Sequence, residues 1–247
     1  MALSIVIPTL NEEKHLRALL DSLLAQHLET AHEVIIVDAS PNDLTTEVVN
    51  QFLNLIPITV TKSSIADIGT QRNIGARLAQ HDHLLFLDAD VILGEGVIQR
   101  SLDRLSPDEL HIISARHRAD RPSFGTHTAL FFIYFLILLA RLAHFPVTNG
   151  DFLLTNKRTF QSLDGFREGF LLGEDTDFGI RARSLGARHS IEWRASITAS
   201  SRRLSTVSAW KLAVIWAAAY MRVIRGKGPT GTRKNDEGYP YGKWSDL

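Results

Sequence analysis

Short apolar runs alternate with helix-like segments along the first part of the chain. The runs have the length of buried strands, and apolar residues recur every three or four positions between them, which is the period of a helix. This alternation is typical of consecutive βαβ units, whose strands form a largely parallel sheet. We therefore expect an α/β fold in which helices flank a mostly parallel central sheet. The expected strands are 4–8, 33–38, 57–61 and 83–88.

Three helices are expected between these strands, and less regular structure follows after residue 100. Asn11 can cap the first helix, because its side chain can accept a hydrogen bond from the first turn. No internal repeat and no interdomain linker is visible in the sequence. The other expected elements are helices at 43–53 and 69–80 and strands at 109–116 and 150–155.

A strongly apolar stretch without charged residues covers 128–140. As a helix it would span about 20 Å, which is short of the roughly 30 Å hydrocarbon core of a membrane. A buried core helix, a helix against a membrane and a subunit interface all remain open for this stretch. A second apolar helix is expected at 207–224, packed against the body of the protein. Residues 226–247 have the composition of a mobile basic tail.

Composition and charge argue against several classes of protein. The chain has no cysteine, which excludes a disulfide framework, a cysteine zinc site and a thiol nucleophile. Its formal net charge of zero argues against a general nucleic-acid-binding protein. The first residues lack the features of a signal peptide, so we expect a cytoplasmic protein. Residues 201–247 are basic, which suits either solubility or contact with phosphates or an anionic membrane surface.

Aspartates follow two of the expected strands. Asp38 ends one strand, and Asp88 and Asp90 stand at the end of another. Ligands of open α/β sheets bind at the carboxyl ends of the strands, so we expect these carboxylates at one edge. At roughly 4 Å and an effective dielectric of about 20, two carboxylates repel by on the order of 4 kcal/mol. Hydrogen bonds, solvent or a cation must therefore offset the repulsion between Asp88 and Asp90.

An Asp-x-Asp after a strand has several explanations when it is taken alone. Paired carboxylates suit Mg²⁺ or Mn²⁺ shared with substrate phosphates, but the pattern also occurs at calcium loops and as a solvent-facing pair. A second acidic cluster, Glu174, Asp175 and Asp177, stands at the start of an expected helix. The helix dipole accounts for one or two acids there. A further carboxylate can act as a general base if a substrate hydroxyl reaches it.

Six segments of the chain together resemble the family 2 glycosyltransferases, which have the GT-A type nucleotide-diphospho-sugar transferase fold. The resemblance covers roughly residues 3–205 and implies one glycosyltransferase domain at 1–225. Residues 1–100 would form its nucleotide-sugar-binding half, and residues 101–225 its acceptor and catalytic half. The segments, in order, are SIVIPTLNEEKHL, EVIIVDASPNDLT, QRNIGARLA, LLFLDADV, NGDFLLTNKRTFQSLDGF and GEDTDFGIRARSLG.

The resemblance also implies roles for the matching residues. Asp90 would bind a Mn²⁺ or Mg²⁺ ion on the donor diphosphate, and Asp88 would face the donor ribose or sugar. Asp175 matches the catalytic base, which deprotonates the acceptor hydroxyl so that its attack inverts the anomeric carbon. Asp38 would bond the nucleotide base. The other expected contacts to the nucleotide and sugar are Pro8, Thr9, Asn11, Glu12, Arg72 and Asn73.

The chain departs from the family pattern in two places. Ala39 stands where the family usually has an acidic residue or glycine. Many relatives have a Gln-x-x-Arg-Trp segment, where this chain has Arg202 and Arg203 as either a diphosphate clamp or surface charges. The processive synthases of the family carry that segment and several membrane spans, so this chain is expected to add one sugar per encounter.

The expected function is therefore a metal-dependent, inverting glycosyltransferase, with UDP-sugars the commonest donors in the family. The apolar run at 128–140 and the basic C-terminal residues suggest a lipid-linked acceptor and peripheral contact with the cytoplasmic membrane face. A non-catalytic nucleotide-sugar-binding protein remains an alternative, which would bind donor without turnover. A haloacid-dehalogenase-like phosphatase, with the first aspartate as nucleophile, is another. Dinucleotide oxidoreductases and sugar nucleotidyltransferases are disfavoured, because their glycine-rich loops are missing.

Overall fold

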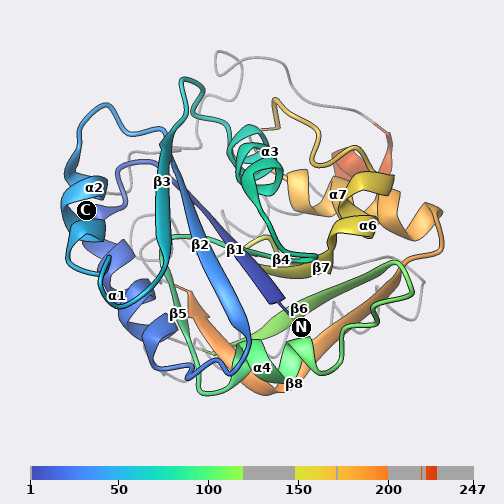
Figure 1. Cartoon of the computed structure of the whole chain (residues 1–247). Helices are drawn as coiled ribbons and strands as arrows, with labels where there is room; N and C mark the ends of the chain where they lie inside the picture. Colours follow the sequence, from blue (N-terminus) through green and yellow to red (C-terminus); the bar gives the residue numbers. More distant parts are fainter. Residues whose placement is uncertain (1, 119–147, 171, 200–217, 219–220, 227–247) are drawn as a thin grey trace, which may run out of the picture.

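The structure, a computed structural model, describes residues 2–118, 148–170, 172–199, 218 and 221–226. Helices cover both faces of one mixed, eight-stranded sheet with the order β3-β2-β1-β4-β7-β6-β8-β5 (Figure 1). The strands are β1 (Ala2–Thr9), β2 (Ala31–Asp38), β3 (Ile58–Lys62), β4 (His83–Leu87), β5 (Val91–Leu93), β6 (His111–Arg118), β7 (Phe152–Asn156) and β8 (Arg188–Ala199). The helices are α1 (Glu13–Leu24), α2 (Leu44–Asn50), α3 (Ile68–Leu78), α4 (Val97–Leu102), α6 (Lys157–Ser162) and α7 (Glu174–Ser184).

The first four strands are parallel to one another, as the alternation in the sequence predicts. β1 pairs with β2 and with β4, and β2 pairs with β3. Their carboxyl ends therefore meet at one edge of the sheet, where Thr9 pairs with Asp38 and Asp38 with Lys62. Asp88 directly follows β4 at the same edge. The prediction that Asp38 and Asp88 share an edge is confirmed.

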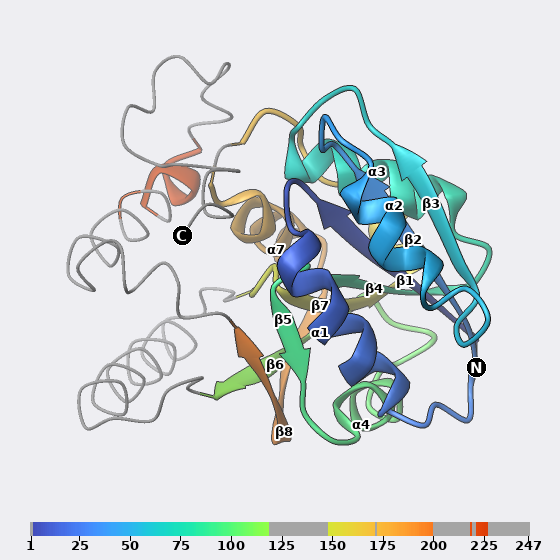
Figure 2. The same ribbon diagram turned by 90° about the vertical axis from the view of Figure 1, so that its left-hand side faces the viewer.

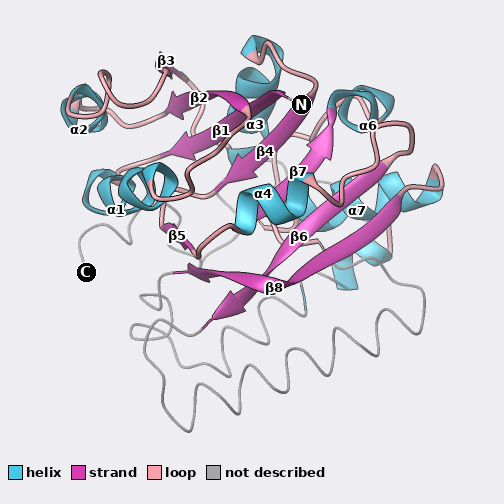
Figure 3. Ribbon diagram, turned by 60° about the horizontal axis from the view of Figure 1, so that its bottom comes forward, coloured by secondary structure: helices cyan, strands magenta, loops and turns pink. Residues whose placement is uncertain are grey.

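The sheet changes direction at β7. This strand pairs antiparallel with β4 on one side and with β6 on the other, and β8 runs parallel to β6 (Figure 3). Leu87 at the end of β4 pairs with Phe152 at the start of β7. The residues that precede β7 therefore lie beside Asp88, whose backbone NH donates to the carbonyl oxygen of Asp151 at 3.3 Å. The antiparallel pairing thus brings a second chain segment to the edge that holds the aspartates.

Each face of the sheet is covered by its own apolar core. Helices α1, α2 and α4 pack on one face through residues such as Leu16, Val49 and Ile98. Figure 2 shows α1 and α2 lying over the strands on this side. Helices α3 and α7 cover the other face, where the rings of Phe166 and Phe178 stack with centroids 4.5 Å apart. Buried aromatic side chains dominate the energetics of such a core, so this cluster anchors α7 firmly against the sheet.

Several details differ from the sequence-based expectations. Asn11 does not cap α1, because Glu12 occupies the N-cap position and no side chain makes the cap hydrogen bond. Asn11 instead has a φ of 55° and donates its backbone NH to Ser40 Oγ at 2.8 Å. Helix α2 ends at Asn50, three residues before the expected Leu53. The sequence did not predict β5, α4, α6 and β8, which complete the second half of the fold.

Some predictions fall wholly or partly outside the described residues. These are the apolar run at 128–140, Arg202 and Arg203, and nearly all of the tail at 226–247. Of the helix expected at 207–224, residues 218 and 221–224 are described and are helical. No described helix is both long and apolar enough to cross a membrane. The division into two functional halves near residue 100 stays a prediction.

Candidate active site

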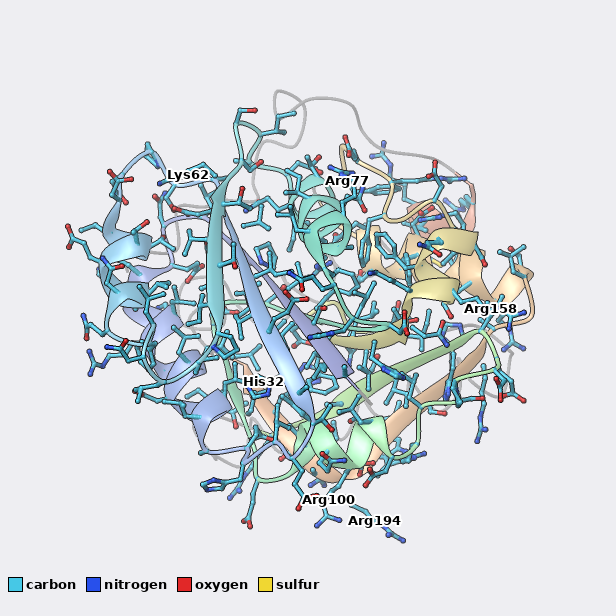
Figure 4. The ribbon with its side chains drawn as sticks, viewed as in Figure 1. His32, Lys62, Arg77, Arg100, Arg158 and Arg194 are labelled. Carbon is cyan, nitrogen blue, oxygen red and sulfur yellow. The ribbon has the colours of Figure 1, made fainter. Side chains whose placement is uncertain are left out.

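The first part of the site lies where β1, β2 and β3 end. Asp38 is fully buried, and its Oδ1 accepts hydrogen bonds from Thr9 Oγ1 at 3.0 Å and from the Ser40 NH and hydroxyl at 3.0 and 2.6 Å. Its Oδ2 accepts from Lys62 Nζ at 3.0 Å. The hydrogen bond to Asp38 raises the pKa of Lys62, whose side chain is 46% exposed. Figure 4 labels Lys62 on this side of the molecule. The ammonium also donates to the carbonyl oxygen of Asn42 at 2.7 Å and lies 3.2 Å from Asp43 Oδ1.

Helix α3 is bonded to the carboxyl ends of β1 and β2. Gln71 Nε2 donates to the carbonyl oxygens of Thr9 and Val37, at 2.9 and 2.7 Å. The helix packs closely on β1 because Gly75 has no side chain, and a Cβ there would lie 2.2 Å from Val6 Cγ1. Helix α3 is therefore bonded to the ends of β1 and β2, where the expected nucleotide-binding residues Pro8, Thr9 and Asp38 lie. Asn11 and Glu12, which are also expected there, follow in the loop between β1 and α1.

Arg72 stands at the centre of the site. It is fully buried, and its Nη1 donates to Glu174 Oε1 at 2.8 Å. Its Nη2 donates to Asp88 Oδ1 and to the carbonyl oxygen of Gly150, both at 2.8 Å. The guanidinium lies over the ring of Phe166, 5.3 Å from the centroid. Charge-assisted hydrogen bonds of this length are among the strongest in proteins, so Arg72 holds three chain segments together.

Asp175 lies at the start of α7, beside the segment that precedes β7. Its Oδ2 accepts from the backbone NH of Gly150 at 2.8 Å, and its Oδ1 accepts from the NH of Thr176 at 2.7 Å. Thr148 Oγ1 donates to the backbone carbonyl oxygen of Asp175 at 2.6 Å. Two backbone donors therefore fix the orientation of the carboxylate. A group that must meet a substrate in one orientation requires such support.

The environment makes the first two carboxylates of α7, Glu174 and Asp175, more basic. Burial and the charge of Asp175 raise the pKa of Glu174 to about 7, against the opposing charge of Arg72. Burial also raises the pKa of Asp175, while Arg72 and the NH groups of Thr176 and Gly150 lower it. Perturbed carboxyl groups of this kind gather at functional sites. A carboxylate with a raised pKa accepts a proton more readily near neutral pH.

Asp90 is half-buried and stands two residues after Asp88. The described residues contain no cluster of three His, Asp or Glu side chains arranged for a metal ion. Mg²⁺ in proteins is commonly bound through only one or two carboxylates, the rest of its ligands being substrate phosphates and water. A cation at Asp90 would therefore need the donor diphosphate and water to complete its ligands.

Asn73, an expected contact to the nucleotide and sugar, and His117, for which no role was expected, both bond to protein groups near the site. Both amide atoms of Asn73 are bonded to the backbone of Phe166, whose NH donates at 2.9 Å and whose carbonyl oxygen accepts at 2.8 Å. His117 contacts the carboxylate of Asp151 next to Gly150. Burial lowers the pKa of His117, but the charge of Asp151 and the hydrogen bond to it outweigh this effect and raise the pKa.

The sequence analysis assigned no role to three functional candidates, which are Gly150, Asp151 and Lys62. Gly150 and Asp151 belong to the NGD triplet, which opens one of the six segments that carry the family resemblance. Their signal was a glycine and an acid directly before an apolar run. Lys62 follows the third apolar run as Asp38 follows the second, so its place at the end of a strand was visible in the sequence.

The model for glycosyl transferase family 2 matches residues 4–171. The poly(ribitol-phosphate) beta-N-acetylglucosaminyltransferase TarS of Staphylococcus aureus is 32% identical over 93 residues, which are 36% of this chain and 16% of TarS. The 4,4'-diaponeurosporenoate glycosyltransferase of Staphylococcus haemolyticus is 29% identical over 195 residues, 70% of this chain and 51% of that one. The chain thus spans about half or less of these relatives.

Solved structures show the same fold. The mannosyltransferase PcManGT from Pyrobaculum calidifontis, in complex with GDP-Man and Mn²⁺, superposes with a TM-score of 0.71 at 16% identity, over 90% of this chain and 64% of that one. Residues 1–349 of TarS in complex with UDP-GlcNAc give 0.61 at 19% identity, over 89% and 66% of the two chains. The fold and the matched sequence agree, and the chain therefore belongs to glycosyltransferase family 2 with its GT-A type fold.

Proposed function

We propose that this protein transfers a sugar from a nucleotide-diphosphate donor to an acceptor hydroxyl, with inversion of the anomeric carbon and with the help of a divalent metal ion. One observation carries the proposal. Asp88, on the expected donor side, and Asp175, the expected base, belong to a single hydrogen-bonded group built around Arg72 and Gly150. A site that joins a donor to an acceptor needs both sides in a fixed relation.

Asp175 would act as the general base. Its carboxylate takes the proton of the acceptor hydroxyl while the hydroxyl oxygen attacks the anomeric carbon. The bond from that carbon to the diphosphate oxygen breaks on the opposite face, and the nucleoside diphosphate leaves with the bonding electrons. The raised pKa of Asp175 and its two backbone donors support this role, because they favour proton uptake in one direction.

Asp90 would hold Mn²⁺ or Mg²⁺ on the donor diphosphate. When bound, such an ion stabilises the negative charge that the leaving diphosphate gains. The end of β1 and the first loop would receive the nucleotide, with the half-exposed side chain of Lys62 at that end of the site. Asp38 is fully buried and bonded to protein at both oxygens, so it would position Thr9, Ser40 and Lys62 for that contact. The Mn²⁺ in the PcManGT complex supports the metal requirement.

A UDP-sugar is the first donor to test, because a structural neighbour carries UDP-GlcNAc, and GDP-mannose is the second. For the acceptor we propose a lipid-linked molecule at the cytoplasmic membrane face, on the basis of the apolar run at 128–140 and the basic C-terminal residues. Sedimentation with anionic liposomes tests this part. Recovery of all the protein in the supernatant would contradict it.

The test of the donor site is thermal unfolding with UDP, GDP or dTDP, each with and without Mn²⁺. A ligand at about 100 times its dissociation constant adds roughly 2.7 kcal/mol of stability, or about 5–10 °C for a domain of this size. We expect a metal-dependent shift with one nucleotide, which Asp90→Ala abolishes and Asp175→Asn retains. Asp175→Asn should also reduce sugar transfer by about 100- to 10,000-fold. Normal transfer by Asp175→Asn would remove it as the base, and no shift with any nucleotide would refute the donor site.

A further inference from the structure

The guanidinium of Arg72 has no surface to offer a ligand. Its side chain is 1% exposed, and its Nη1 and Nη2 atoms are bonded to protein oxygens at 2.8 Å. Its Nε is buried as well. Phe166 covers one face of the group. The family resemblance suggests a contact between Arg72 and the donor. In the structure, however, the protein groups named above enclose the side chain.

The partners of Arg72 come from three distant parts of the chain. Asp88 follows β4, Gly150 precedes β7, and Glu174 opens α7. Gly150 touches both sides of the site, since its carbonyl oxygen accepts from Arg72 and its NH donates to Asp175. Arg72 is therefore connected to the base in two ways. It bonds to Gly150, which bonds to Asp175, and it bonds to Glu174, which precedes Asp175 in the chain.

The charges around Arg72 explain why a cation is needed there. The carboxylates of Asp88, Glu174 and Asp175 all act on this one guanidinium, and Asp151 acts on Asp175. Burial of so many carboxylates without a cation would be costly. The positive charge of Arg72 lowers the pKa of Glu174 and of Asp175, against the effect of burial. Arg72 thus helps to keep the base ionised.

We propose that Arg72 is a positioning residue, which locks the donor side of the site to its base and touches neither donor nor acceptor. The proposal rests on the function proposed above. Because Arg72 sets the relation between Asp88 and Asp175, it governs the rate of the transfer step. Donor affinity depends on other groups, at the ends of β1, β2 and β4.

Arg72→Lys tests this inference. Lysine keeps the positive charge, but a compact ammonium cannot replace the planar fork that reaches three partners. The assay is the metal-dependent hydrolysis of UDP-GlcNAc or GDP-mannose, whichever the wild-type protein cleaves, measured as released nucleotide over a range of pH. A misplacement of about 1 Å costs up to roughly 100-fold in rate, so we expect a loss in kcat of about that size. The KM for donor should change by less than about threefold, because a group acting only in the transition state affects kcat.

The pH profile adds a readout that general damage to the fold would not produce. Asp175 faces Arg72, Glu174, Asp151 and the NH groups of Gly150 and Thr176. Arg72→Lys keeps the charge but not the hydrogen-bonded position of the guanidinium, so the charge should lower the pKa of Asp175 less, and the acidic limb of kcat should move to higher pH. Glu174→Gln removes a neighbouring carboxylate instead, so it should lower kcat and move the acidic limb to lower pH.

Arg181→Lys is the matched control. Arg181 bonds to Asp177 and to the carbonyl oxygens of Leu163 and Gly165 at 2.6–2.9 Å, and it lies 5.8 Å from the ring centroid of Phe178. It has the same kind of partners as Arg72 and lies on the helix that carries the base, but its printed bonds go to Asp177, Leu163 and Gly165 and not to Asp88, Gly150, Glu174 or Asp175. We expect Arg181→Lys to lower the melting temperature and to leave kcat and the acidic limb unchanged.

The outcomes separate the two proposals. If wild-type protein neither binds a nucleotide with Mn²⁺ nor hydrolyses either donor, the proposed function fails and the role of Arg72 fails with it. If wild-type protein is active and Arg72→Lys raises the donor KM with kcat unchanged, Arg72 binds the donor and only the present inference is overturned. If Arg72→Lys does not fold, an unchanged kcat and pH profile in Glu174→Gln overturns the inference.

Discussion

Replacing Gly150 by alanine should slow transfer while the protein stays folded. A Cβ at this position would lie 2.9 Å from Nη2 of Arg72 and 3.1 Å from Cβ of Asp175. Non-bonded carbon atoms prefer separations of about 3.5–4.0 Å, so the guanidinium or the base must retreat by roughly 0.5–1 Å. The backbone at Gly150 lies outside the positive φ region, which leaves steric contact as the cause of the effect.

The size of the effect follows from this displacement. A shift of up to about 1 Å at a reacting group costs as much as roughly 100-fold in rate, so kcat should fall by about 10- to 100-fold. Overpacking costs about 1–3 kcal/mol of stability, which lowers the melting temperature by about 2–12 °C for a chain of this length. The assay is nucleotide release from the donor at saturating concentration, corrected for the folded fraction by circular dichroism.

Gly94→Ala is the control for overpacking away from the site. A Cβ there would lie 2.3 Å from the carbonyl oxygen of Ser196, in the connection between β5 and α4. This variant should lose stability and keep its kcat per folded molecule. A Gly150→Ala protein with unchanged kcat would refute the reasoning, because it would show that the contacts of Gly150 with Arg72 and Asp175 do not set the rate.

Two further predictions concern stability. His111 is buried and accepts from the NH of Ser106 at 3.1 Å; burial and the charges of Arg188 and Arg104 lower its pKa from 6.5 to about 4. Because this pKa is depressed in the folded protein, the unfolded chain binds the proton more tightly, and stability falls as pH drops from 6.5 towards 4. His111→Gln should therefore flatten this part of a plot of melting temperature against pH. A slope equal to that of the wild-type protein would contradict the prediction. Asp38→Asn should lower the free energy of unfolding by about 1–3 kcal/mol, because the four groups that donate to Asp38 would no longer face a buried carboxylate. Lys62→Met should lower it by less, because Lys62 is half-exposed. Equal midpoints of urea unfolding for the two variants would contradict this ranking.

The sequence predicted the part of the fold that local pattern determines. The strands that end near Asp38 and Asp88 are short apolar runs with helices between them, and parallel βαβ units leave little choice in where their carboxyl ends lie. The acids at the start of α7 were also predicted, because a cluster of carboxylates before apolar residues is a helix-start signal. Both halves of the acidic site could therefore be found without a structure.

The connection between these halves could not be predicted. β7 inserts antiparallel between β4 and β6, and nothing in the period of its apolar residues indicates which strands flank it. The role of Gly150 depends on that insertion, since only the pairing of β7 with β4 brings it to Arg72. Arg72 itself lies on a helix of low amphipathic contrast, where a charged residue is usually exposed. Its burial follows from tertiary contacts alone.

The long sequence separation around Arg72 has a consequence for how the chain folds during synthesis. The ribosome completes β1 to β4 when Asp88 emerges, but Gly150 and Glu174 follow only later. Until then the guanidinium lacks two of its three partners, and burying it would leave a charge poorly compensated. The N-terminal half is therefore expected to remain open around α3 and to close when α7 arrives. An isolated fragment of residues 1–100 should accordingly behave as a loosely packed chain and not as a domain of its own.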